Sequence, residues 1–205
     1  CMNSANGFGM TVPPHGLFQM KDGAWCYVVK RFDRNKGGGK IHKETLFQIL
    51  NAKEKYSGTL EQVGGAILAH TKFSVLDALD FFERVVLLFL IANGDMHLKN
   101  WALLLDEEIG WRLSPCYDFV CTRLCVQDED SALTINGKNN KLEREDFYKL
   151  AVYLELDPKA IHNSTKKFAE GKAKILGMVD SSQMISVDKT RFQDLINSRY
   201  LRLFG

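Results

Sequence analysis

The middle of the chain reads NGDMHLKN over residues 93–100, and YDF follows at residues 117–119. The first segment brings an acid, an imidazole, an amine and an amide into one short stretch. It lies between an apolar run that ends at Ala92 and a second apolar run from Trp101 to Leu105. Titratable side chains between two core segments cost free energy unless they are paired or used in function. This stretch is therefore the first candidate for a functional site.

The residues after this stretch predict a β-hairpin. Residues 101–105 have the composition of a buried strand, residues 106–110 that of a turn, and residues 111–114 that of a returning strand, which Pro115 ends. In an antiparallel hairpin, the residue entering the first strand and those leaving the second lie at the same end. We therefore expect Asn100 and Asp118 to face each other. The alternative for Asp118 is a cap of the turn after Pro115.

Asn100 and Asp118 carry the oxygen atoms that suit Mg²⁺, an amide carbonyl and a carboxylate. This ion keeps several waters and binds few protein groups together with substrate phosphates. Asp95, five residues before Asn100, is a candidate general base above the same place. His97 is either a satisfied core histidine or part of the site, and its neighbours favour the second interpretation. The spacing D-x-x-x-x-N, a hairpin and then an aspartate is that of the kinase catalytic loop and its metal-binding aspartate.

Other segments of the chain extend this pattern. In sequence order they are Val28–Arg34, Ile41–Glu44, Lys55-Tyr56, residues 93–100, Ser114–Asp118 and Ala132–Lys138. Together these segments resemble the HipA family of bacterial toxin kinases. The resemblance covers nearly the whole chain, and its most specific part is residues 93–100 with the later Tyr117-Asp118.

The resemblance implies an α+β, predominantly helical fold: a protein-kinase-like C-terminal lobe with a small β layer. Residues 1–34 would be a remnant of the N-lobe and hinge, and residues 35–205 would be the helical C-lobe with the catalytic loop and metal-binding hairpin. It also implies a serine/threonine protein kinase of a bacterial toxin–antitoxin system. Family members act on translation components, notably aminoacyl-tRNA synthetases, and a HipB-like DNA-binding antitoxin holds them in check.

The resemblance further implies a role for each site residue, with ATP and Mg²⁺ as cofactors. Asp95 would be the catalytic base, and His97 and Lys99 would support it through packing of the loop and contact with phosphate or substrate. Asn100 and Asp118 would hold Mg²⁺ against the ATP phosphates. Lys30, Arg31 and Phe32 would form the hinge that contacts the adenine.

The chain departs from the family pattern at its start. A HipA-like protein first has a small N-terminal subdomain, a glycine-containing phosphate loop and a strand with an ATP-contacting lysine. The sequence from Cys1 lacks these parts, and Lys30 is a poor substitute. Gly37-Gly38-Gly39-Lys40 lacks the spacing of a phosphate-binding loop, which favours a flexible connector. Either these parts belong to a separate chain, or the present chain is a fragment. In both cases we expect the present chain alone to have low activity, because phosphoryl transfer depends on positioning.

The composition is that of an ordinary globular domain. With 27 basic and 25 acidic residues in 205, the net charge of +2 gives no electrostatic reason for direct nucleic-acid binding. The apolar run Phe81–Ala92 is shorter than the ~20 residues of a membrane span, so we expect no membrane partner. Five cysteines, an odd number, favour free thiols in a reducing compartment and hence a cytoplasmic protein. Cys116, Cys121 and Cys125 lack the fourth ligand of a zinc site.

Periodicity predicts the remaining elements. We expect a hairpin of residues 17–20 and 24–29 in which the second strand, Trp25–Val29, is buried. Leu46, Phe47 and Leu50 suggest a helix, and others are expected over residues 59–69, 74–92, 146–154, 158–178 and 189–204. Thr122–Asp130 would be a loop that covers the site. His42 and Glu44 are candidate cleft residues; the alternative is that Glu44 stands at the start of a helix, near its dipole.

Three classes of function remain open on the sequence. The first is phosphoryl transfer from Mg-ATP to a protein hydroxyl. The second is an incomplete or inactive kinase domain that acts as a binding module for an antitoxin or another partner chain. The third is a metal-assisted hydrolase that uses Asp95, His97 and Asp118. An asparagine among the metal ligands and the hinge-like segment before Asp33 favour the kinase.

Overall fold

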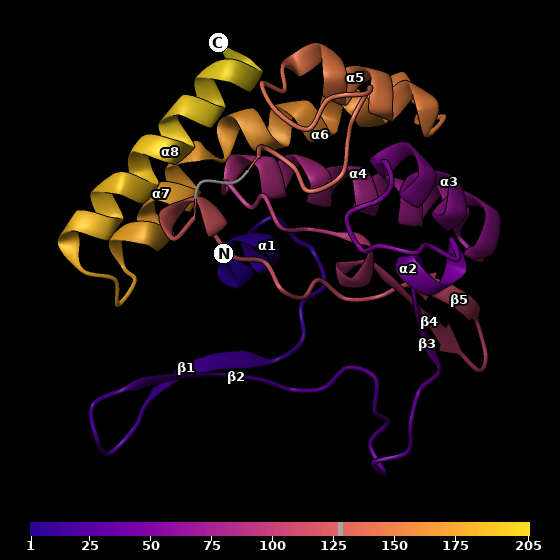
Figure 1. The fold of residues 1–205 in the computed structure, drawn as a ribbon, viewed down its shortest axis with the longest axis horizontal. Helices are drawn as coiled ribbons and strands as arrows, with labels where there is room; N and C mark the ends of the chain where they lie inside the picture. Colours follow the sequence, from indigo (N-terminus) through magenta and orange to yellow (C-terminus); the bar gives the residue numbers. More distant parts are fainter. Residues whose placement is uncertain (127–128) are drawn as a thin grey trace.

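The computed structural model describes residues 1–126 and 129–205 and has three parts: a helical body, a small sheet on one side of it, and a hairpin that projects below (Figure 1). The described helices are α1 (Met2–Gly7), α2 (Leu46–Ile49), α3 (Leu60–His70), α4 (Ser74–Leu90), α5 (Arg144–Tyr153), α6 (Pro158–Glu170), α7 (Lys172–Asp180) and α8 (Ser186–Phe204), with short 3-10 turns η1 (Leu98–Asn100) and η2 (Thr122–Leu124). The fold is α+β and predominantly helical, as the sequence predicts.

Helix α4 is the centre of the helical body. From Phe81 to Leu90 all its side chains except Glu83 are buried, and it contacts α3, α5, α6 and α8. The buried Arg84 binds Asp80 and donates a hydrogen bond of 2.7 Å to the backbone oxygen of Ser114. Beyond the helix, Ala92 has a left-handed φ of 54°, which turns the chain sharply. Residues 93–100 therefore start from a fixed point in the core.

The β-hairpin predicted after residue 100 is present and belongs to a three-stranded sheet. Strands β4 (Ala102–Asp106) and β5 (Gly110–Leu113) pair antiparallel, with Leu103 opposite Leu113. Strand β3 (Lys43–Thr45) adds to the free side of β4, with Thr45 opposite Ala102. This pairing, which the sequence did not indicate, places residues 43–45 next to the start of the hairpin. The expected helix after Lys43 is shortened to the single turn α2.

The N-terminal hairpin forms as predicted, but the burial predicted for its second strand is wrong. Strands β1 (His15–Gln19) and β2 (Trp25–Val29) pair antiparallel. Trp25 and Tyr27 are nevertheless 48% and 52% exposed, and Phe18 on β1 is 58% exposed. An apolar, β-branched and aromatic composition predicts a strand but not the surface that covers it. In the described part of the chain, most of this hairpin faces solvent.

The helix predicted over Pro158–Met178 is in fact two helices, which Gly171 separates. A Cβ built on Gly171 would lie 2.3 Å from the ring of Phe8, whose centroid is 4.7 Å from that of Phe168. The glycine thus admits the Phe8 ring from the N-terminal segment, which a side chain at residue 171 would exclude. Helix α1 packs on α7, so residues 2–10 form part of the helical core.

Other predictions on helices agree with the structure. Thr59 caps α3, and its side chain accepts a hydrogen bond from the N–H of Gln62.

The loop Thr122–Asp130, expected to cover the site, begins with η2, but its residues 127–128 lie outside the described residues. Among the described residues, no helix combines the length and apolar content that a membrane span requires.

Candidate active site

Asn100 and Asp118 meet at the open end of the β4–β5 hairpin, as the sequence predicts. The Asn100 side-chain amide donates a hydrogen bond of 2.9 Å to Oδ2 of Asp118. The same Nδ2 lies 3.3 Å from the backbone oxygen of Asp95. The two segments are 18 residues apart in sequence, and the hairpin brings them together. The side-chain amide of Asn100 thus lies within hydrogen-bonding distance of two other predicted site residues, the Asp118 carboxylate and the backbone of Asp95.

Asn93 holds these two segments together. Its Oδ1 accepts a hydrogen bond of 2.9 Å from the N–H of Asp95, and its Nδ2 lies 3.3 Å from the backbone oxygen of Asp118. The neighbouring Gly94 N–H donates to Oγ1 of Thr122 at 2.8 Å. Asp118 itself has a left-handed φ of 61°, which aspartate tolerates better than most residues. No separate role for Asn93 or Thr122 could be predicted, because their side chains bind backbone groups that a sequence pattern does not place.

The carboxylate of Asp95 is held on one side by a tyrosine from a distant segment. The hydroxyl of Tyr56 donates a hydrogen bond of 2.8 Å to Oδ1 of Asp95. The N–H of Leu98 donates to the backbone oxygen of Lys55 at 3.0 Å, so the segment around residue 56 is fixed against the loop. Among the described residues no donor contacts Oδ2 of Asp95. That oxygen is available to accept a proton from a bound alcohol.

His97 packs beneath the loop. It is 7% exposed, and its ring lies edge-on to that of Tyr56 at a centroid distance of 5.2 Å. Its buried Nδ1 has no hydrogen-bond partner in the described chain. Burial, and next the positive charge of Lys55, lower the pKa of His97. The imidazole is therefore neutral at physiological pH, which suits a packing role beside Asp95.

Lys99 points away from this core toward solvent. Its ammonium lies 4.8 Å from the centroid of the Phe47 ring, and no acidic side chain holds it in the described structure. Its backbone oxygen accepts a hydrogen bond of 2.9 Å from the hydroxyl of Tyr117. Burial, and next the charge of Asp118, raise the pKa of Tyr117 well above its usual value, so this hydroxyl remains a donor. The position of Lys99 allows contact with a ligand that approaches from outside.

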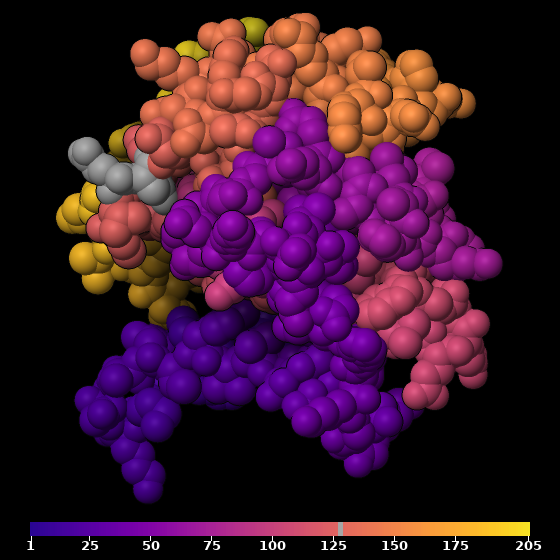
Figure 2. Space-filling view, turned by 45° about the vertical axis from the view of Figure 1, so that its right-hand side comes forward, coloured from indigo at the N-terminus to yellow at the C-terminus, as the bar shows by residue number. Residues whose placement is uncertain are grey.

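A large cleft lies beside these residues. Its volume is about 1050 Å³, and it is lined by the N-terminal hairpin and by residues from η2, α7 and α8. Lys30, Arg31 and Phe32, predicted to contact adenine, line this cleft together with Asp118. In the space-filling view the N-terminal residues form the lower part of the surface, beneath the helical body (Figure 2). The cleft is large enough for a nucleotide.

The sequence missed Lys43, which lines this cleft. Its ammonium lies 5.4 Å from the centroid of the Tyr117 ring and 5.6 Å from that of Phe32. His42 and Glu44, the suggested cleft residues, instead bind each other at 2.8 Å and do not line the cleft. Successive side chains of a strand point to opposite faces, so Lys43 and its two neighbours cannot all face one side. A cation at this position suits an anionic ligand beside Asp118.

The chemistry of the donor atoms fits a hard cation. An asparagine amide and an aspartate carboxylate stand at hydrogen-bonding distance, and turning the Asn100 amide over presents its oxygen to a cation instead of its nitrogen. In the described residues, no group of three or more His, Cys, Asp and Glu side chains could hold a metal ion. A site of two oxygen ligands needs further ligands from water and phosphate. This is the ligand set expected for magnesium bound with a nucleotide.

Comparison with known proteins identifies the family. A family model described as the HipA-like C-terminal domain matches residues 1–198. The chain belongs to this HipA-like family. The resemblance inferred from the sequence segments is thereby confirmed.

Two relatives of this HipA-like chain have names that refer to kinases. The "Putative kinase Y4dM" of Sinorhizobium fredii strain NGR234 is 30% identical over 188 residues, which are 82% of this chain and 45% of that protein. A "Putative kinase" of Haemophilus influenzae is 30% identical over 125 residues, 55% of this chain and 36% of that protein. The chain thus spans less than half the length of these curated relatives.

Solved structures confirm the kinase-like fold. HipA of Shewanella oneidensis MR-1, solved in a complex with HipB and its operator DNA, superposes with a TM-score of 0.85 at 18% identity. That match covers 100% of this chain and 54% of the Shewanella chain. CtkA, a proinflammatory kinase of Helicobacter pylori, superposes with a TM-score of 0.69 at 17% identity, over 98% of this chain and 80% of CtkA.

Proposed function

We propose that this HipA-like chain supplies the catalytic part of a serine/threonine protein kinase, which transfers the γ-phosphoryl group of Mg-ATP to a protein hydroxyl. The observation that carries the proposal is the position of Asn100 at one end of the β4–β5 hairpin, where its side-chain amide lies 2.9 Å from the Asp118 carboxylate and 3.3 Å from the backbone oxygen of Asp95. Kinase chemistry needs this arrangement of a base beside two oxygen ligands, because catalysis is mainly positioning and charge neutralisation.

Each residue has a role in this proposal. Asp95 accepts the proton of the substrate hydroxyl through Oδ2, while Tyr56 fixes its other oxygen. Asn100 and Asp118 hold Mg²⁺, which supplies positive charge against the ATP phosphates. His97 keeps the loop packed as a neutral ring. Lys99 contacts phosphate or substrate from the outer side.

The cleft beside these residues is the proposed nucleotide site. Lys30, Arg31 and Phe32 are the proposed hinge that meets the adenine, and all three line the cleft. Lys43 lies on the same lining as Asp118 and is placed to neutralise phosphate charge. In this proposal residues 1–34 are a remnant of the N-lobe and hinge, and residues 35–205 are the C-lobe.

The phosphate loop and the strand lysine would come from a further portion of the protein, either as a preceding segment or as a separate chain. The chain covers 54% of the Shewanella HipA chain. The exposed apolar side chains of β1 and β2 support this proposal, because an isolated two-stranded hairpin is marginally stable in water. Additional strands and side chains on this hairpin would bury that surface.

We also propose a toxin–antitoxin role in a bacterial cytoplasm, with a HipB-like DNA-binding antitoxin as partner. Support comes from the family assignment and from the complex in which the Shewanella relative was solved. The proposed substrate is a translation component such as an aminoacyl-tRNA synthetase.

A transfer assay with labelled ATP tests the kinase proposal. The chain is produced together with the portion that supplies the phosphate loop, and phosphate incorporation into protein is followed. We expect Asp95→Ala to lower transfer by at least ~100-fold, the usual contribution of a positioned base, while nucleotide binding remains. Asp194→Ala is the matched control and keeps full transfer, because Asp194 is an exposed residue of α8 whose side chain makes no hydrogen bond or ion pair with any described residue. Unimpaired transfer by Asp95→Ala would refute the assignment of the base.

One observation favours a second candidate function, that of a binding module. The projecting hairpin exposes Phe18, Trp25 and Tyr27, a surface of the kind that partner proteins cover. A module of this kind would form a stoichiometric complex with an antitoxin or another chain. It would show no phosphate transfer and no magnesium-dependent binding of ATP in that complex, and this result separates it from the kinase.

A further inference from the structure

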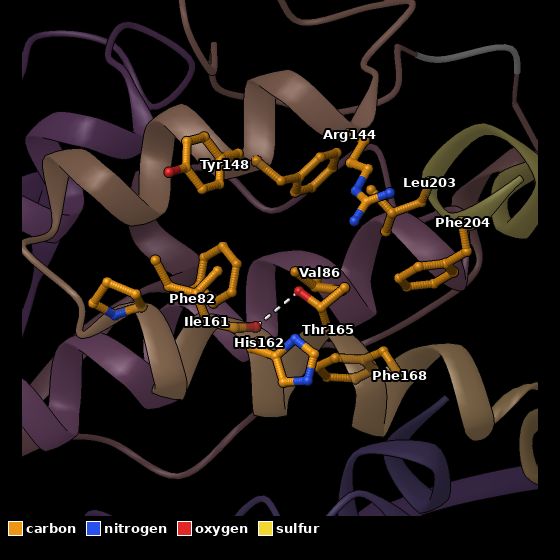
Figure 3. A pocket seen from close by; sticks show the side chains of 12 residues that line it. Phe82, Val86, Arg144, Tyr148, Ile161, His162, Thr165, Phe168, Leu203 and Phe204 are labelled. Carbon is orange, nitrogen blue, oxygen red and sulfur yellow. Dashed lines mark hydrogen bonds between the residues drawn. The ribbon is translucent and has the colours of Figure 1, made fainter.

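A second cavity lies in the helical body, away from the nucleotide cleft. It has a volume of about 230 Å³, is open to solvent on one side, and is lined by residues of α4, α5, α6 and α8 (Figure 3). None of its lining residues also lines the cleft that contains Asp118. The proposed kinase reaction therefore makes no use of this cavity.

The walls of this cavity are apolar and mainly aromatic. The aromatic side chains are Phe82, Phe147, Tyr148, Phe168 and Phe204. Thr165 also lines the cavity, but its hydroxyl donates a hydrogen bond of 2.8 Å to the backbone oxygen of Ile161 within the same helix (Figure 3). Its polar atom is therefore already satisfied. An apolar ligand would meet rings and methyl groups on most sides.

The walls are held in place by contacts outside the cavity. Ser164 on α6 donates a hydrogen bond of 2.7 Å to Glu83 on α4, and Lys167 binds the same carboxylate at 2.5 Å. The hydroxyl of Tyr200 on α8 donates to the backbone oxygen of Phe168 at 3.0 Å. These contacts fix the positions of α4 and α8 relative to α6. The cavity is thus formed before any ligand arrives, which lowers the entropic cost of binding.

One cation lies at the exposed side of this apolar space. Arg144, the first residue of α5, is exposed, and its guanidinium lines the cavity beside Leu203 and Phe204 (Figure 3). It makes no hydrogen bond or ion pair with any residue that the structure describes. His162 adds a second nitrogen-bearing side chain to the lining.

The acidic residues next to Arg144 form no ion pair with it. The N–H of Glu143 donates a hydrogen bond of 2.9 Å to the Asp146 carboxylate, and Glu145 lies 4.0 Å from the ammonium of Lys149. Asp146 itself binds Asn136 and Lys138. The guanidinium is therefore left to interact with an anion from outside the chain, and guanidinium groups bind carboxylates through paired hydrogen bonds.

We propose that this cavity binds a small aromatic carboxylate, with the ring among the phenylalanines and the carboxylate on Arg144. Size supports this class of ligand. A cavity of ~150 Å³ holds benzene, or ~25 Å³ for each non-hydrogen atom. On that scale the present volume of about 230 Å³ holds about nine such atoms. Benzoate has this size, and its shape and charge match the lining.

The test compares benzoate with benzamide, a neutral molecule of the same shape and number of non-hydrogen atoms. Binding to the full chain is followed by NMR of the methyl groups of Val86, Ile161 and Leu203, which line the cavity. We expect saturable shifts with benzoate and binding of benzamide weaker by about tenfold, the effect of losing a charge-assisted hydrogen bond. Arg144→Gln should lower the affinity for benzoate to that for benzamide.

Two further variants complete the test. Lys159→Gln removes an exposed charge from α6 outside the cavity lining and should leave benzoate affinity unchanged. Ile161→Phe fills the cavity and should abolish binding of both molecules while the chain stays folded. Equal benzoate affinity in the original chain and in Arg144→Gln would overturn the proposal. Shifts that do not saturate, or that appear only at other methyl groups, would overturn it as well.

Discussion

Replacing Asn100 by aspartate would place two carboxylates against each other at the proposed metal site. The hydrogen bond of 2.9 Å between Asn100 and Asp118 would be lost, and two negative charges would face each other instead. Two unit charges ~4 Å apart repel by ~1 kcal/mol in bulk water and by ~4 kcal/mol at an effective dielectric constant of ~20. Asn100 is buried and Asp118 is exposed, so we expect Asn100→Asp to lower the free energy of unfolding by ~2 kcal/mol.

Both a lower pH and added Mg²⁺ should reduce this loss of unfolding free energy. Repulsion raises the pKa of the introduced carboxyl in the folded state above its unfolded value. At acidic pH the folded state then binds more protons than the unfolded state. The loss of unfolding free energy relative to the original chain is therefore complete near neutral pH and becomes smaller as the pH falls toward ~4. Mg²⁺ between the two carboxylates neutralises the repulsion. The variant should therefore gain more stability from Mg²⁺ than the original chain does.

The measurement is chemical unfolding with and without Mg²⁺, with a chelator as reference. Asn136→Asp is the matched control, because Asn136 donates a hydrogen bond of 2.9 Å to Asp146 in the same way. Lys138 lies 3.1 Å from that carboxylate and already supplies a positive charge. We expect the control to gain nothing specific from Mg²⁺. Equal gains in both variants, or none in Asn100→Asp, would contradict the reasoning about the metal site.

Asp130→Asn should lower the free energy of unfolding by ~3 kcal/mol, because it leaves two arginines without their buried anion. Burial raises the pKa of Asp130, but hydrogen bonds and the two arginine charges lower it by more, so the net shift is downward. The difference in unfolding free energy between Asp130→Asn and the original chain, measured in urea, should therefore vanish as acid protonates Asp130 below pH ~4. Burial raises the pKa of Cys116 to about 11, so a thiol reagent at neutral pH should label the exposed Cys125 and reach Cys116 only on unfolding. Tyr56→Phe should lower kcat several-fold in the transfer assay while the melting temperature changes little, because the hydroxyl positions Asp95 at an exposed site.

The central geometry of the site could be predicted because it follows from local rules. An apolar run, a turn and a returning strand fix a hairpin, and a hairpin fixes which residues meet at its open end. Asn100 and Asp118 meet for that reason. The cap of α3 at Thr59 is likewise a local signal.

Features that depend on distant contacts could not be predicted. Tyr56 reaches Asp95 across 39 residues, and the ring of Phe8 packs over Gly171 from the far N-terminal side. Which side chains of β3 face the cleft depends on how β3 pairs with β4, and composition does not reveal this pairing. Lys43 is on the side that lines the cleft. The exposure of Trp25 could not be predicted for the same reason, because a strand pattern does not show whether another part of the protein covers the strand.

The most direct test of the central claim is a manganese relaxation measurement. Mn²⁺ takes the same oxygen ligands as Mg²⁺ and broadens NMR signals close to it. With ATP present, the account predicts that Mn²⁺ first broadens the Asn100 side-chain amide and the backbone amides of residues 93–100 and 117–119, and that Asp118→Asn removes the effect. Broadening centred on another part of the molecule, or unchanged in Asp118→Asn, would contradict the account.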